Sequence, residues 1–64
     1  MGKRRRIQFQ FEFDIRVLEN NGTEHILTGV NHIRIGEEGD LIISRNNHSD
    51  IIFPFNIWAS YTVE

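Results

Sequence analysis

The sequence contains no cysteine, so neither a disulfide bond nor a thiolate metal site can hold this chain together. A chain of 64 residues is expected to form one domain. Domains of this size bury only about 60% of the surface that the unfolded chain exposes. Stability that packing does not supply must come from another subunit, so we expect oligomerisation. The lack of cysteine also fits a reducing compartment, and we predict a cytoplasmic location.

Long apolar runs are also missing from the sequence. No stretch approaches the about 18 consecutive apolar residues that a membrane-spanning helix needs. The basic residues at the start lead into alternating polar and apolar residues, whereas a signal peptide would continue with an apolar block. We therefore expect a protein that is neither secreted nor inserted in a membrane.

Charge is distributed unevenly along the chain, which has a formal net charge of -2. Lys3, Arg4, Arg5 and Arg6 are four of its seven cationic residues, so the remainder carries three cations against nine carboxylates. We predict a basic flexible tail over residues 1–6 and a single acidic domain over residues 7–64. An acidic domain argues against nucleic-acid binding over the whole fold, but the four tail residues remain candidate contacts to a polyanion.

The first clear structural signal is a strict alternation from Ile7 to Val17. Apolar residues occupy every odd position of this stretch and polar or charged residues every even position. This pattern predicts a β-strand with one buried face. Asn21 and Gly22 follow, and this pair is typical of a tight hairpin turn, so residues 23–30 should return antiparallel.

Further extended segments are predicted over residues 32–35, 41–44, 51–53 and 55–64. Gly29 indicates a bulge or a sharp bend, and Pro54 marks an edge or a corner because proline cannot donate a hydrogen bond to a sheet. No helix of useful length is expected. The fold class is all-β, as a small antiparallel barrel or a strongly curled sheet of five to six strands, in an oligomer.

Several apolar residues fall on the face of a strand that should be polar. They are Leu18, Ile42, Ile52 and Trp58. Either another segment of the same chain covers them, or they form an interface with a second subunit or a partner, where apolar clusters and tryptophan concentrate. We predict the interface, with these four residues as its candidates.

The length of the first predicted strand supports association with another chain. Residues 7–18 would extend about 40 Å at roughly 3.3 Å per residue. A domain of this size has a diameter of roughly 28 Å. The strand must therefore bend strongly within the domain or leave it to pair with another chain.

Constellations that could carry catalysis or hold a metal are weak. Glu12 and Asp14 share one strand face but are expected to be solvated. Ser44, His48, Ser49 and Asp50 have the residue types of a hydrolase triad, yet they lie within one turn and no separate element orients a base. The spacing of His25, His32 and His48 matches no metal motif. We predict no catalytic residues, no metal site and no cofactor.

The sequence therefore favours a non-enzymatic protein-binding or inhibitory accessory domain that acts through a homo-oligomeric β scaffold. Small stand-alone domains of this kind are typical of viral or phage accessory factors, an association that rests on size alone. A nucleic-acid-binding accessory protein that uses the basic tail is the alternative. A small-ligand binder with a pocket between subunits is the third. The phenylalanines at positions 9, 11 and 13 are assigned to the core rather than to a base-stacking surface.

Overall fold

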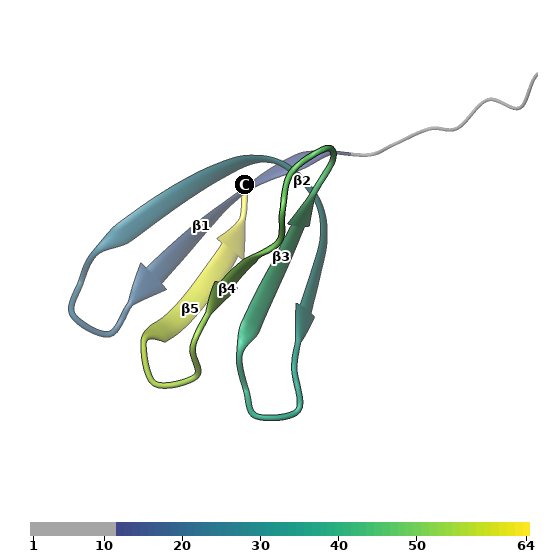
Figure 1. Ribbon diagram of the computed structural model, residues 1–64. Coiled ribbons are helices and arrows are strands. Elements are labelled where there is room, and N and C mark those ends of the chain that lie inside the picture. Colours follow the sequence, from purple (N-terminus) through teal and green to yellow (C-terminus); the bar gives the residue numbers. More distant parts are fainter. Residues whose placement is uncertain (1–11) are drawn as a thin grey trace, which may run out of the picture.

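The computed structural model describes residues 12–64, which form five antiparallel strands in one sheet (Figure 1). Their bounds are Phe13–Glu19 for β1, Glu24–Ile35 for β2, Leu41–Arg45 for β3, Ile51–Phe53 for β4 and Trp58–Val63 for β5. The order across the sheet is β4-β3-β2-β1-β5. The all-β prediction is confirmed. Within residues 12–64 the sheet does not close into a barrel, because β4 and β5 are its two edges and do not pair with each other.

The predicted hairpin turn at Asn21 and Gly22 is confirmed, and the turn between β2 and β3 has the same hydrogen bonds. The Gly22 amide donates to the Glu19 carbonyl over 2.9 Å, and the Gly39 amide donates to the Gly36 carbonyl over 3.0 Å. Gly22 has a φ of 94° and Gly39 a φ of 92°, a region that favours glycine. In each hairpin a single glycine therefore completes the turn.

Residues 24–35 form one long strand, which corrects the prediction of two separate strands over 23–30 and 32–35. Residues 24–30 pair with β1, and residues 30–35 pair with β3. Gly29 lies at an irregularity of the register and has a φ of 68°, so the expected bulge is present. The strand continues through this irregularity and changes its partner there.

The last strand begins at Trp58 rather than at Phe55, which corrects the predicted span of 55–64. Residues 54–57 form a turn in which the Ile57 amide donates to the Pro54 carbonyl over 2.9 Å. This short turn joins β4 to β5, the two opposite edges of the sheet. Four residues can link the two edges only because the sheet curls strongly between them.

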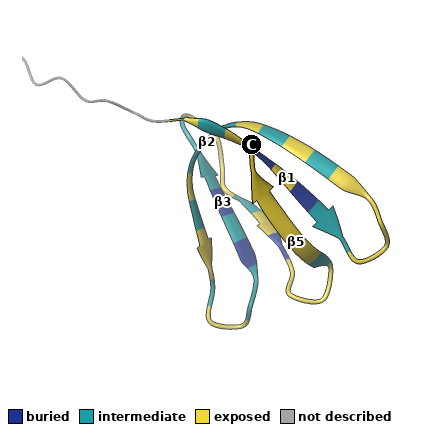
Figure 2. Ribbon diagram, turned by 180° about the vertical axis from the view of Figure 1, so that it is seen from behind, coloured by how far each residue is buried: buried dark blue, intermediate teal, exposed yellow. Residues whose placement is uncertain are grey.

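The core lies on the inner face of the curled sheet. Its buried residues are Ile15, Val17, Val30, Leu41, Ile43 and Phe53. In β1 and β3 the buried residues occupy alternate positions, as the geometry of a strand requires, and β2 and β4 each contribute one further residue, Val30 and Phe53. Figure 2 shows buried residues on β1 and β3, whereas β5 is almost entirely exposed. The predicted core residues Ile7, Phe9 and Phe11 lie outside the described residues.

Candidate functional site

The most exposed element of the sheet is β5, whose outer margin we call the β5 edge. Every residue of β5 except Trp58 is exposed. Tyr61 and Val63 pair with Val17 and Ile15, which are fully buried, yet Tyr61 keeps 38% and Val63 54% of its surface exposed. The contrast arises because, among residues 12–64, no strand lies beyond β5.

Two of the four predicted interface residues are brought together. Ile42 and Ile52 are direct partners in the pairing of β3 with β4, and both point to the outer face of the sheet. Ile52 is 57% exposed, and Ile42 is half-buried. Cross-strand apolar neighbours of this kind form a continuous apolar surface. The outer face therefore carries a small apolar patch at the β4 edge.

Leu18 and Trp58 do not join this patch. Leu18 lies on the outer face of β1 between Glu24 and Ser60, two strands away from β3. Trp58 is paired with Glu19 on the inner face and packs against the core. The structure thus separates the four residues into three places, and a role of each in an interface stays a prediction.

Trp58 makes two further contacts inside the chain. Its indole Nε1 donates to the Gly39 carbonyl over 2.9 Å, and its ring lies 6.3 Å from the ring of Tyr61. A half-buried indole whose N–H has a partner meets the usual requirement of a tryptophan in a core. The covering segment that the sequence left open is therefore in part the chain's own turn between β2 and β3.

The turn between β2 and β3 also contacts the turn between β4 and β5. The Phe55 amide donates to Asp40 Oδ1 over 3.0 Å, and a Cβ added to Gly39 would lie 3.1 Å from the Phe55 Cβ. Together with the Trp58 bond, these contacts hold the turn between β4 and β5 against the turn between β2 and β3. These contacts stabilise the curl of the sheet at the end where the turn from β4 to β5 joins its two edges. The neighbouring Glu37 and Glu38 remain exposed.

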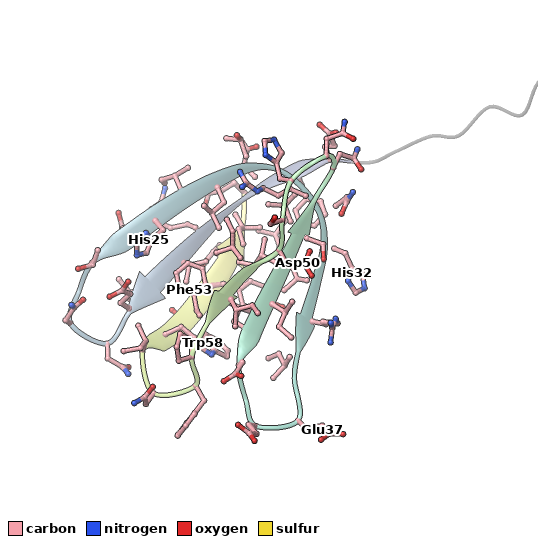
Figure 3. All side chains as sticks on the ribbon, in the orientation of Figure 1. His25, His32, Glu37, Asp50, Phe53 and Trp58 are labelled. Atoms are coloured by element: carbon pink, nitrogen blue, oxygen red, sulfur yellow. The ribbon has the colours of Figure 1, made fainter. Side chains whose placement is uncertain are left out.

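One polar contact on the inner face was missed by sequence reasoning. His25 Nε2 lies 2.6 Å from Glu19 Oε2, and the imidazole is tilted against the ring of Phe53 with a centroid distance of 5.2 Å (Figure 3). His25 pairs with Val17, so alternation placed it on the inner face. The contact with Phe53 depends on the curl of the sheet, which no local pattern revealed.

A shallow cavity of about 240 Å³ lies beside the first hairpin turn. Its lining residues are Glu19, Asn20, Asn21, Asn56 and Ile57. Asn20 Nδ2 already donates to the Asn56 carbonyl over 3.0 Å, and Glu19 is held by His25. The bond between Asn20 and Asn56 joins the two walls of this cavity and holds the hairpin against the turn before β5.

The remaining candidates lie apart or outside the described residues. Within residues 12–64, no three histidine or acidic side chains come together as a metal site would require. Ser44 lies within β3, next to its last residue, while His48, Ser49 and Asp50 lie exposed in the following loop. No helix in this part of the chain is long and apolar enough to cross a membrane. Lys3, Arg4, Arg5 and Arg6 lie outside the described residues.

Comparison with known proteins returned no matching family model, no matching curated protein and no matching solved structure.

Proposed function

We propose that this protein is a non-enzymatic protein-binding domain that pairs with partners, including copies of itself, through the β5 edge. The observation that carries the proposal is the exposure of Tyr61 and Val63 beside fully buried partners on β1. An edge strand presents, on its unpaired side, a row of backbone donors and acceptors to another chain. Recognition by strand addition uses this row for affinity and the flanking side chains for specificity.

The dimensions of the β5 edge support this role. β5 spans six residues, whereas β4 at the opposite edge spans only three. Natural proteins protect an edge by keeping its strand short or by placing charged side chains on it. β5 has neither protection, because Trp58–Val63 contains no charged residue. The simplest self-association is a two-fold dimer in which β5 pairs antiparallel with β5 of a second copy.

The proposal is tested by placing a charge on the β5 edge. Tyr61→Lys puts an ammonium group beside the edge, and at 38% exposure the change leaves the buried core in place. Light scattering across the micromolar range should give a mass above the monomer for the wild type and the monomer mass for the variant. Circular dichroism should show the same β content for both proteins.

Ile26→Lys is the matched control for this experiment. Ile26 is 55% exposed and lies on the outer face of β2, away from both sheet edges. This variant should keep the mass of the wild type. A wild type that is monomeric across the whole range would contradict self-association, and an equal effect of both lysines would contradict the choice of β5.

A further inference from the structure

The cavity beside the first hairpin turn has walls from two distant parts of the chain. Glu19, Asn20 and Asn21 belong to the end of β1 and its turn, whereas Asn56 and Ile57 belong to the turn before β5. The end of β1 lies next to the start of β5, as Figure 1 shows, because the two strands are paired there. The cavity therefore lies where β5 begins.

Hydrogen bonds fix both walls of this cavity. The Asn20 amide donates to the Ile57 carbonyl over 2.7 Å, and Asn20 Nδ2 donates to the Asn56 carbonyl over 3.0 Å. The Glu19 amide donates to the Thr23 carbonyl over 2.8 Å, which closes the hairpin that supplies the first wall. A cavity whose walls are already joined needs little ordering when a ligand binds.

Most polar residues of the cavity keep an oxygen acceptor free. Glu19 Oε2 is bound to His25, but Glu19 Oε1 has no hydrogen-bond partner within residues 12–64. Asn20 donates through Nδ2, so its Oδ1 remains available, and the side-chain amide of Asn56 has no partner in the described part of the chain. Asn21 is the exception, because its Oδ1 accepts a bond from the backbone amide two residues later.

The charge of the cavity is negative. Glu19 is the only ionisable residue that lines it, and its side chain is 19% exposed, so solvent screens this carboxylate less than one on the open surface. Among residues 12–64, Glu19 forms no ion pair with an arginine. An anion would be repelled here. A metal ion would need further carboxylates, and no three acidic or histidine side chains gather in the described chain.

These properties fit a cationic side chain. An ammonium or guanidinium group has several N–H donors and no acceptor, so it matches a set of free oxygens. The alkyl stem of such a side chain packs against apolar surface, which Ile57 supplies at 39% exposure. The cavity volume of about 240 Å³ lies below the roughly 300–1,000 Å³ of sites for free small molecules, so a side chain fits better than a cofactor.

We propose that this cavity binds the ammonium or guanidinium group of a lysine or arginine carried by a partner strand on the β5 edge. Asn56 and Ile57 lead directly into β5, so a strand paired with β5 passes the cavity beside Trp58. Neighbouring strands are about 4.8 Å apart, and a lysine or arginine side chain is long enough to cross one strand. A strand antiparallel to β5 would carry this cation near its own C-terminal end.

The cavity would give the β5 edge a preference among partners. Backbone donors and acceptors of an edge strand accept any extended segment, whereas a cavity for one side chain selects a segment with the right residue at the right place. The assignment of the cation to a strand on the β5 edge rests on the proposed function. Binding of a cation by the cavity depends only on the lining residues, so the two parts can be tested separately.

The first experiment titrates the full chain with free cationic side chains. The probes are Nα-acetyl-lysine methylamide and Nα-acetyl-arginine methylamide, and NMR spectra of isotope-labelled protein report the site. The backbone amide signals of Asn20, Asn21 and Ile57 should shift saturably with at least one probe, with a dissociation constant in the millimolar range expected for a single ion pair. Nα-acetyl-norleucine methylamide lacks the charge and should bind about fivefold more weakly or worse. Equal binding of the norleucine compound, or no binding of either cation, would overturn the inference.

Glu19→Gln tests the carboxylate. The change removes the charge but keeps an oxygen to which His25 can donate, and it should weaken the better probe about fivefold. Glu37→Gln is the matched control, because it removes the same charge from an exposed position in the turn between β2 and β3, and it should leave the affinity unchanged. Figure 3 shows Glu37 at the tip of that turn. Equal weakening by both variants would mean that the probe responds to the net charge of the protein and not to the cavity.

Ile57→Lys is a second variant, which leaves Glu19 in place. Its ammonium group would occupy the free oxygens of the cavity, so binding of the probe should fall about fivefold or more. Ile26→Lys adds the same charge on the outer face of β2 and should keep the affinity of the wild type. An Ile57→Lys protein that binds the probe as the wild type does would overturn the inference, even if Glu19→Gln failed to fold.

Two strand peptides test which segment carries the cation. Both are capped peptides as long as β5 with alternating threonine and valine, and a single lysine stands at the C-terminal end of one and at the N-terminal end of the other. The first should bind about threefold more tightly, and Glu19→Gln should remove the difference. Equal binding of both peptides would overturn the inference and leave the β5 edge standing. Failure of both peptides, beside saturable binding of the free probe, would contradict the β5 edge alone.

Discussion

The two halves of β2 belong to one strand but have different surroundings. Residues 24–30 pair with β1, which is covered in turn by β5, and here Leu27 is half-buried on the inner face. Residues 30–35 pair with β3, and at their end Ile35 is 54% exposed although it also faces inward. The neighbouring strands, rather than the hydrophobicity of the residue itself, therefore decide how deeply an inward side chain is buried.

The largest effect is expected from truncating an isoleucine in the covered region. Ile15 pairs with Leu27 of the first half and is fully buried. Ile15→Ala should lower the free energy of unfolding by about 4 kcal/mol, because it leaves a cavity in the core. Ile35→Ala makes the same chemical change in the second half and should cost less than about 1 kcal/mol if the inner face is open there. Urea denaturation of both variants measures the difference, and equal losses would mean that Ile35 is covered as fully as Ile15.

The next effect concerns Trp58, which connects the two regions. It lies on β5 beside β1, and its indole N–H donates to the carbonyl of Gly39, in the turn that follows the second half of β2. Trp58→Ala should cost about 3 kcal/mol through lost packing and the lost hydrogen bond. If all its contacts lie within one chain, the loss is the same at every protein concentration. A loss that grows on dilution would show that Trp58 also contacts a second subunit, as the sequence prediction requires.

A smaller effect is expected at the bend between the two halves. Gly29 has a φ of 68°, and a Cβ added there would meet only Glu12 Oε1 at 3.9 Å. Gly29→Ala should therefore cost about 1 kcal/mol from backbone strain alone. Gly36→Ala is the matched control, since Gly36 has no positive φ and its added Cβ would lie 3.4 Å from Ile42 Cδ1. The melting temperature of Gly29→Ala should be lower than that of Gly36→Ala. The reverse order would show that the bend does not require glycine.

Local patterns predicted the parts of this fold that depend on local chemistry. The alternation around Ile15 and Val17 indicated the inner face of β1, and Asn21 with Gly22 indicated the first turn. Gly29 indicated the bulge in β2. Each of these features is fixed by a few consecutive residues, so the sequence alone is sufficient to predict it.

Features that depend on contacts between distant residues were missed or left open. The turn at residues 54–57 reads as a strand, because Phe55 and Ile57 continue the alternation of the residues that follow. The turn forms because the chain must pass from β4 at one edge to β5 at the other. For the candidate site, the alternation of side chains along each strand assigned Ile42 and Ile52 to the same face. It could not show that Trp58 donates to the carbonyl of Gly39.

The order of strands also governs how the sheet can assemble in time. β1 with β2, β2 with β3, and β3 with β4 are hairpins between consecutive segments, and such pairs form quickly because the loops to be closed are short. β5 instead pairs with β1, and the Glu64 amide donates to the Asp14 carbonyl over 2.8 Å at the opposite end of the described chain. During synthesis on the ribosome, Ile15 and Val17 therefore lack their β5 partners until residues 58–63 have emerged. A nascent chain arrested before Trp58 should expose them to chaperones, and emergence of residues 58–64 should end that exposure.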